Sequence, residues 1–194
     1  MNMKPSRWSV LVELLKNAKQ SVAFAEGLSD SEVERAEETY EFQFPPDLRE
    51  FLQTAMPKGC PFPNWRSEQQ SEIRDMLRLP IHGVLFDVER NDFWLPEWGP
   101  KPIQIADAKM VAEELMGKAP RLIPVYGPRM IPDRPCLAGN PVFSVHQTDL
   151  VYWGFDLDDY FRHEFGVPEL KPWPTEIRRI EFWDVDRWQS LRWR

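Results

Sequence analysis

The chain has 194 residues, of which 42% are hydrophobic and 28% charged, a composition that excludes a disordered protein. Its formal net charge of -7 argues against general affinity for nucleic acid or anionic lipid. No apolar run approaches the ~20 residues that span a bilayer, and the N-terminal segment lacks the features of a signal peptide. Two distant cysteines, Cys60 and Cys136, favour a thiol-reducing cytosol over a disulfide or zinc site. The length suits one domain over residues 1–194.

The first part of the chain is predicted to be helical. Hydrophobic residues at helical spacing indicate a first helix over residues 8–19. The next helix has a complete start signal, because Ser29 is placed to be the N-cap and Glu32 to close a capping box. It is expected to run to about Phe42 with its acidic residues facing water.

Two further helices follow before the chain changes character. Pro46 suits the first turn of a helix, and Ser67 is expected to start another helix that ends near Leu79. The stretch beyond is rich in aromatic residues, Gly and Pro. It is predicted to contain a short helical turn near 83–89 and a short strand at Phe93–Leu95.

The second half is predicted to alternate strands and helices. A helix at 105–117 ends at a glycine, and residues 121–132 form an edge strand or two strands joined by a tight turn. A helix from 156 to 166 follows, with a short strand near 177–182 and a helix capped by Asp184. Helices followed by mixed strands and helices predict an α+β fold.

Residues 140–154, NPVFSVHQTDLVYWG, contain the three residue types of a hydrolytic triad: Ser144, His146 and Asp149. In an extended strand, Ser144 and His146 share one face, and we expect Asp149 on the other face or in a turn. A flat strand also lacks the exposed elbow and the oxyanion hole that a serine nucleophile uses. We therefore interpret the stretch as a hairpin or as one strand bent at the polar pair Thr148-Asp149, and a hydrolase using these residues is an alternative.

A second polar group lies where the 156–166 helix is expected to begin: Asp156, Asp158 and Asp159. Acidic residues at a cap and in a first turn are favoured by the free N–H groups and the helix dipole. The three histidines lie in separate segments without metal-ligand spacing. We expect no metal or cofactor, and a metalloenzyme using this aspartate group is an alternative.

Residues 26–41 hold seven acids against a single base, Arg35. This run is either a solvated helix face or an acidic patch for a basic partner. A Trp- and Pro-rich segment further on could supply aromatic interface anchors, unless its tryptophans belong to the core. The candidate partner-binding residues are Asp30, Glu34, Glu37, Glu38, Glu41, Asp92, Trp94, Glu97 and Trp98.

Five blocks follow in order: GLSDSEVERAEETYEFQFPPDLREFL, GVLFDVERNDFWLPEWGPKP, APRLIPVYGPRMIP, GNPVFSVHQTDLVYWGFDLDDYFRHEF and IEFWDV. Together they resemble the SUKH superfamily over roughly residues 28–185. One departure is Pro128, where the family often has histidine, so no role of that histidine is carried over to this chain. Arg129 keeps its place, and we expect it to pair with a buried acid such as Asp149 or Asp87.

The resemblance implies a single α+β domain whose mixed, largely antiparallel sheet is flanked by N-terminal and C-terminal helices. Many bacterial members are similar to immunity proteins that neutralise a cognate toxin in the cytosol, and fungal relatives regulate cell-wall synthesis through protein contacts. No catalytic activity or cofactor comes with the family. We expect a toxin-binding immunity protein, with a basic nuclease as one possible toxin. The alternative is a regulatory scaffold that binds a cellular protein, and the oligomeric state is left open.

Overall fold

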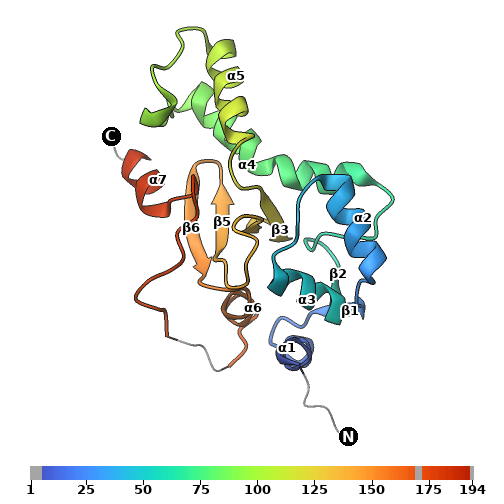
Figure 1. The fold of residues 1–194 in the computed structure, drawn as a ribbon. Coiled ribbons are helices and arrows are strands. Elements are labelled where there is room, and N and C mark those ends of the chain that lie inside the picture. The colour runs from blue at the N-terminus through green and yellow to red at the C-terminus, as the bar shows by residue number, and fades with distance from the viewer. Residues whose placement is uncertain (1–5, 169–171, 193–194) are drawn as a thin grey trace, which may run out of the picture.

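A four-stranded antiparallel sheet lies in the middle of the molecule (Figure 1). The computed structural model describes residues 6–168 and 172–192. The sheet order is β3-β4-β5-β6, with β3 (Leu122–Tyr126), β4 (Arg129–Pro132), β5 (Val142–His146) and β6 (Asp149–Gly154). A second antiparallel sheet pairs β1 (Ala23–Glu26) with β2 (Ala55–Lys58). The predicted α+β class is confirmed, and each strand pair in the described part of the chain is antiparallel.

Helices surround the sheet on both faces. They are α1 (Arg7–Lys16), α2 (Asp30–Tyr40), α3 (Pro46–Thr54), α4 (Gln70–Arg90), α5 (Ile105–Met116), α6 (Leu157–Phe165) and α7 (Val185–Arg192), with a 3-10 turn η1 (Pro96–Trp98). In Figure 1, α1 to α3 lie on one side of the sheet, α7 lies beside β6 on the other side, α6 lies below the sheet, and α5 lies at the opposite end from α6. No helix in the described part of the chain is long and apolar enough to cross a membrane.

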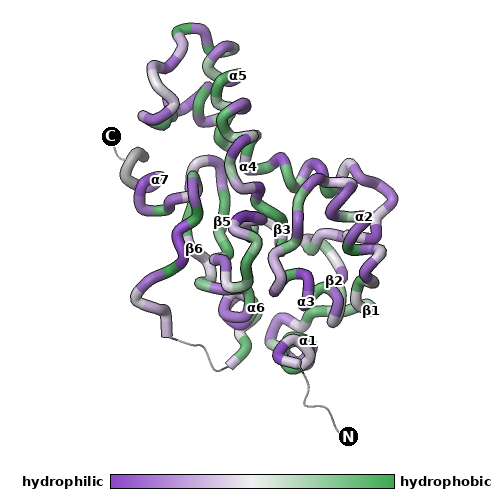
Figure 2. Tube along the Cα trace, viewed as in Figure 1, coloured by the Kyte–Doolittle hydropathy of each residue, from purple (hydrophilic) through white to green (hydrophobic). Residues whose placement is uncertain are grey.

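The sheet separates two hydrophobic cores, because neighbouring strand residues point to opposite faces. Ile131 and Val142 pack into a first core with α1, α2, α3 and α6. Met130 and Phe143, each one position away, pack into a second core with α5, α7 and the second half of α4. Hydrophobic stretches accordingly run through the central strands, whereas α2 is mostly hydrophilic (Figure 2).

Local start and stop signals position most of the predicted helices. Ser29 caps α2, and its hydroxyl and the Glu32 carboxylate complete the predicted capping box. Pro46 opens α3, and Asp156 caps α6 by accepting the Asp159 N–H at 2.7 Å. Asp184 accepts the Arg187 N–H at the start of α7. These helix starts are confirmed. The three capping bonds join residues three positions apart, and Pro46 needs no capping partner.

The predicted break near residue 79 is wrong, because α4 is one helix of 21 residues that continues through Pro80. Its first half contributes Ile73 to the first core, and its second half contributes Val84 and Val88 to the second. Burial at both ends outweighs the ~3 kcal/mol that an interior proline costs. The helix therefore joins the two cores.

The predicted strands at Phe93–Leu95 and 177–182 are also wrong, since residues 93–95 and 177–182 are irregular. Phe93 and Leu95 are both buried in the second core, and Ile180 is buried in the same core. Their apolar spacing reflects anchoring of extended chain onto a core, which sequence alternation does not distinguish from a strand.

Candidate protein-binding surface

Of the hairpin and the bent strand predicted for residues 140–154, the structure has the hairpin, but the expected facing of Asp149 is wrong. The two-residue turn brings Asp149 directly opposite His146, and Ser144 lies opposite Val151. Directly opposed residues of an antiparallel pair share a face, so Asp149 lies on the face of Ser144 and His146. The Ser144 hydroxyl accepts a hydrogen bond from Arg129 Nη1 at 2.6 Å. A nucleophilic serine needs a base next to its hydroxyl to take the proton, but the group next to Ser144 is the guanidinium of Arg129, which donates a hydrogen bond.

Arg129 pairs with an acid that the sequence did not indicate. Its Nε donates to Glu164 Oε2 at 3.2 Å, and its guanidinium lies 3.9 Å from the ring centre of Trp153. The Trp153 indole N–H donates to the same carboxylate at 2.5 Å. Asp87, one of the expected partners, instead accepts bonds from Thr148. The Arg129 contacts join β4 to β6 and α6.

The aspartates at the start of α6 serve that helix. Asp156 is the N-cap, Asp159 accepts the Phe155 N–H at 3.3 Å, and Asp158 pairs with Arg162 at 3.0 Å. Among residues 6–168 and 172–192, no three His, Cys, Asp or Glu side chains come together as a metal-binding group.

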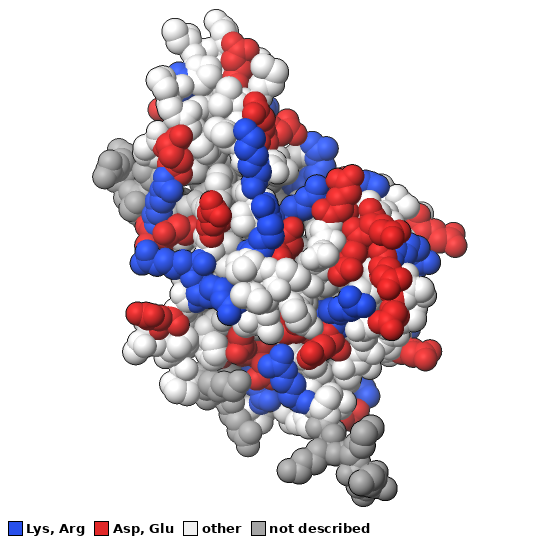
Figure 3. All heavy atoms as spheres, viewed as in Figure 1, with Lys and Arg blue, Asp and Glu red and all other residues white. Residues whose placement is uncertain are grey.

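Four of the candidate acids lie along one side of α2, because positions i, i+4, i+7 and i+8 share a helix face, and a fifth, Glu41, follows as the C-cap residue in a left-handed conformation. This acidic stripe consists of Asp30, Glu34, Glu37, Glu38 and Glu41. The opposite side of the helix buries Val33, Ala36 and Tyr40 in the first core. Figure 3 shows acidic side chains gathered over α2. The helix therefore presents the stripe to solvent while its apolar side holds it in place.

Arginines from other segments neutralise both ends of the acidic stripe. Asp30 accepts hydrogen bonds from Gln53 at 2.8 Å and from Arg49 at 3.2 Å, which lower the pKa of its carboxyl. At the other end, Glu41 lies 3.3 Å from Arg121. These bases come from α3 and from the start of β3, so the local charge of residues 26–41 overstated the acidity of the surface.

The middle of the stripe keeps its charge. Glu34 and Glu38 are exposed and make no ion pair within the described residues. Glu37 is half-buried and accepts the Phe44 N–H at 2.9 Å, which fixes the chain as it leaves α2. Of the five acids of the stripe, Glu34 and Glu38 are therefore the strongest candidates for contact with a partner, and Glu37 lies beside them.

On the other side of α2, Arg66 holds the start of the helix. It donates to Glu32 through Nε at 2.6 Å and Nη2 at 2.9 Å, and to the carbonyls of Glu26 and Gly27 at 2.8 and 2.9 Å. Its Nη1 also lies 3.9 Å from the sulfur of Met56. The bond from Arg66 is the main cause that lowers the pKa of Glu32 to about 2. Arg66 therefore has a structural role.

Replacing Arg66 by glutamine is expected to lower the free energy of unfolding at pH 7 by about 2 to 3 kcal/mol, since charged hydrogen bonds are lost. Because the folded pKa of Glu32 lies below its ordinary value of 4.5, this carboxylate stabilises the fold above that pH. The stabilisation is lost as pH falls from about 4.5 to about 2. Urea unfolding across this range should show that loss in the wild type and a weaker pH dependence in Arg66→Gln.

The matched control is Arg49→Gln, which removes the exposed pair with Asp30. Such pairs contribute about 0 to 1 kcal/mol, so stability at pH 7 should change little. Equal losses in the two variants would contradict the role assigned to Arg66.

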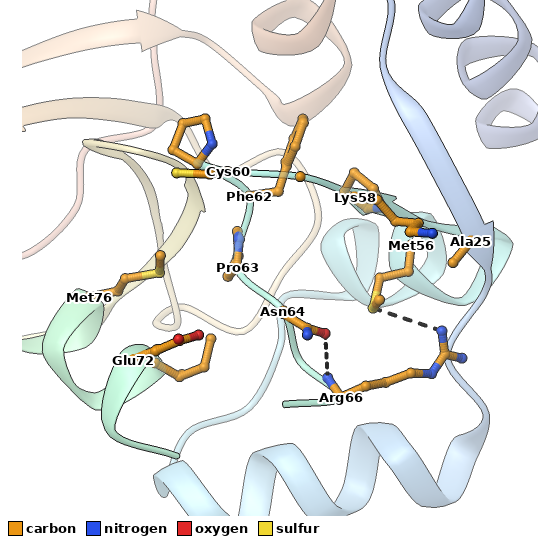
Figure 4. Close-up of a pocket in the computed structure, with 14 residues that line it drawn as sticks. Ala25, Met56, Lys58, Cys60, Phe62, Pro63, Asn64, Arg66, Glu72 and Met76 are labelled. Atoms are coloured by element: carbon orange, nitrogen blue, oxygen red, sulfur yellow. Dashed lines mark hydrogen bonds between the residues drawn. The ribbon is translucent and has the colours of Figure 1, made fainter. Parts of the chain in front are cut away.

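Arg66 also borders a cavity of about 640 Å³ between the β1–β2 sheet and the first turns of α4 (Figure 4). Apolar side chains, among them Met56, Phe62, Ile73 and Met76, form most of its wall. The thiol of Cys60 lies in the same wall, and Lys58 and Glu72 contribute charged groups of opposite sign. Such a lining suits an apolar group.

The remaining candidate residues lie on the loop between α4 and α5, away from the acidic stripe (Figure 1). Trp98 is buried in the second core, so it cannot serve as an exposed anchor. Trp94 packs edge-on against Trp98 and donates to the Gly99 carbonyl at 2.7 Å. Asp92 pairs with Lys101 at 2.6 Å, and Glu97 pairs with Arg187. These contacts hold the loop onto the second core.

Comparison with protein-family models, with curated proteins and with solved structures gives no match. The resemblance to the SUKH superfamily therefore stays a prediction, and the support for a function comes from the surface of α2 and its surroundings. On that surface, Glu34 and Glu38 at the centre of the acidic stripe are exposed and make no ion pair within the described residues.

Proposed function

We propose that this chain is a protein-binding domain that uses the acidic stripe of α2 to bind a basic partner protein. The observation that carries the proposal is that Glu34 and Glu38 point into solvent from a helix held by the first core. Carboxylates on a rigid helix speed the encounter with a basic surface, and they do so most strongly at low salt.

A hollow beside the stripe supports the proposal. Glu37 and Glu41 form one wall, and Arg121, Arg134 and Phe42 contribute to the rest, around a volume of about 440 Å³. Interfaces gain affinity when a side chain of one partner fills a recess in the other. The stripe and the hollow together offer a charged surface with an adjoining recess.

The resemblance described for residues 28–185 supports a more specific proposal. Under it, the partner is a cognate toxin, and this chain is an immunity protein that covers the toxin's basic surface. A nuclease is a suitable toxin of this kind, because carboxylates on the stripe resemble the charge of a nucleic acid substrate. The second candidate is a regulatory scaffold, for which the same surface would bind a cellular protein.

Charge reversal of the stripe by Glu34→Lys and Glu38→Lys together should weaken binding of a toxin encoded beside this gene by at least about 10-fold. The association rate should fall, and its dependence on salt should become smaller. Surface plasmon resonance at two or more salt concentrations measures both effects.

The matched control is Glu68→Lys with Asp107→Lys, which makes the same change of charge at exposed positions outside the stripe. It should retain most of the affinity. If the two double variants lose affinity equally, net charge and not the stripe controls binding. If the neighbouring gene product does not bind and cells are not protected, the immunity proposal fails.

A further inference from the structure

A second recess lies between the end of α2, the middle of α4, the end of α5 and the start of β3. Its volume is about 400 Å³, within the range of small-molecule sites. Apolar residues line much of it: Leu77, Pro80, Ile81, Met116, Pro120, Leu122 and Trp183. Met116, Leu122 and Trp183 are themselves buried, so these parts of the lining are fixed by the second core.

Three arginines line this recess. Arg74 and Arg78 lie on α4 one turn apart, and Arg121 is the residue just before β3. Two acids, Glu41 and Glu113, share the lining, so its formal charge is positive. Figure 3 shows basic side chains between the acidic surface over α2 and the end of the molecule that carries α5.

The three guanidiniums keep donors for a ligand. Within the described residues, Nη1 of Arg74 and of Arg78 and Nε of Arg121 have no hydrogen-bond acceptor. Arg66 at the larger cavity differs, because its N–H groups all bond to the protein. The recess beside α5 therefore combines an apolar lining with guanidinium groups that can still donate.

The two acids in this lining, Glu41 and Glu113, would compete with an anionic ligand for the arginines, but their ion pairs are weak. Arg78 pairs with Glu113 at 3.1 Å, with side chains 55% and 49% exposed. Arg121 pairs with Glu41 at 3.3 Å, with side chains 45% and 80% exposed. Exposed pairs contribute about 0 to 1 kcal/mol, so an anion that contacts both arginines can displace them.

We propose that this recess binds a small organic anion that carries an apolar body and a phosphate or carboxylate group. The apolar body would lie against Met116, Leu122 and Trp183, and the anionic group would accept bonds from Arg78 and Arg121. Guanidinium groups bind both anions in a bidentate manner, so the two anionic groups share one recognition chemistry. The site is separate from Glu34 and Glu38, although Glu41 and Arg121 also line the hollow beside the stripe, and it does not depend on the proposed function.

Isothermal titration of the full chain with 1-naphthyl phosphate, 1-naphthoate, 1-naphthol and inorganic phosphate tests the proposal. At least one naphthyl anion should bind at one site, and at least about 10-fold more tightly than either naphthol or phosphate alone, because it uses both halves of the recess. The ratio of the two naphthyl affinities identifies the preferred anionic group.

Three variants locate the binding. Arg78→Gln should weaken the preferred naphthyl anion by about 10-fold, since a charge-assisted hydrogen bond is lost. Glu113→Gln should strengthen it by a few-fold, because Arg78 loses its competing acid. Arg90→Gln is the control on the same helix, outside the recess and with a side chain 66% exposed, and it should retain the affinity.

Opposite effects of Arg78→Gln and Glu113→Gln, with Arg90→Gln unchanged, support the site. The proposal is overturned if no naphthyl anion binds saturably, or if naphthol binds as tightly as the anions. It is also overturned if Arg90→Gln weakens binding as much as Arg78→Gln, which is the result of unspecific attraction to positive charge.

Discussion

Replacing Asp87 by alanine is expected to lower the free energy of unfolding by about 3 to 4 kcal/mol, because the substitution removes a buried carboxylate that accepts three hydrogen bonds. Asp87 is 2% exposed on the second half of α4. Its Oδ2 accepts the backbone N–H of Thr148 at 2.9 Å and the Thr148 hydroxyl at 2.5 Å. Its Oδ1 accepts from the Asn91 amide at 2.5 Å. Alanine leaves the buried Thr148 donors without an acceptor.

Urea unfolding followed by circular dichroism measures this loss. The control is Asp75→Ala, an exposed aspartate on the same helix, for which the change should stay within about 0.5 kcal/mol. Amide hydrogen exchange in Asp87→Ala should rise first in the β5–β6 hairpin, because its turn is released from α4. A loss below about 1 kcal/mol would show that the turn does not depend on Asp87.

Several helix boundaries were predictable from local signals, although the start expected at Ser67 is wrong, because α4 begins at Gln70 with Gln69 as its N-cap. The Ser29 cap with Glu32, the opening Pro46 and the Asp156 cap each depend on residues close in sequence, and the structure has all three. The hairpin was predictable for the same reason, since its two strands are adjacent and joined by a short polar turn. Such signals act before any tertiary contact forms.

Where the sequence predicted the wrong secondary structure, contacts between residues distant in sequence determine the structure that forms. Pro80 would end an isolated helix, but the two cores hold α4 on both sides of it. The strand expected at Phe93–Leu95 is irregular chain whose alternate residues are anchored in the second core. Nothing local separates an anchored irregular segment from a strand, because both bury alternate side chains.

The acidic stripe was predictable only in part. Helical spacing correctly places Asp30, Glu34 and Glu38 on the exposed face of α2, whereas Glu37 is half-buried and Glu41 is the C-cap beyond the helix. Its neutralised ends depend on Arg49 and Arg121, which are distant in sequence from the acids they contact. The recess beside α5 was not predicted at all, because Arg78 and Arg121 meet only through the packing of α4 against β3.

Gly83 shows how closely α4 packs against the turn between β5 and β6. A Cβ on Gly83 would lie 2.6 Å from the Cα of Gln147, in the turn between β5 and β6. Gln147 has a positive φ of 55°, so the backbone conformation of the turn leaves little freedom to move away. Gly83 lies one turn before Asp87 on α4, so the two residues contact the same turn from one helix face.

Replacing Gly83 by valine is therefore expected to lower the free energy of unfolding by about 3 kcal/mol, although valine is the better helix former by a few tenths. Leu79→Val, one turn earlier and half-exposed, is the control and should cost less than about 1 kcal/mol. Both Gly83→Val and Asp87→Ala detach the same turn, so the double variant should lose about 1 to 2 kcal/mol less than the two single losses combined. Urea unfolding of the four proteins in the cycle measures this coupling. If the losses in free energy of unfolding add up in the double variant, Gly83 and Asp87 hold the hairpin turn through independent contacts, and the proposed coupling between them is wrong.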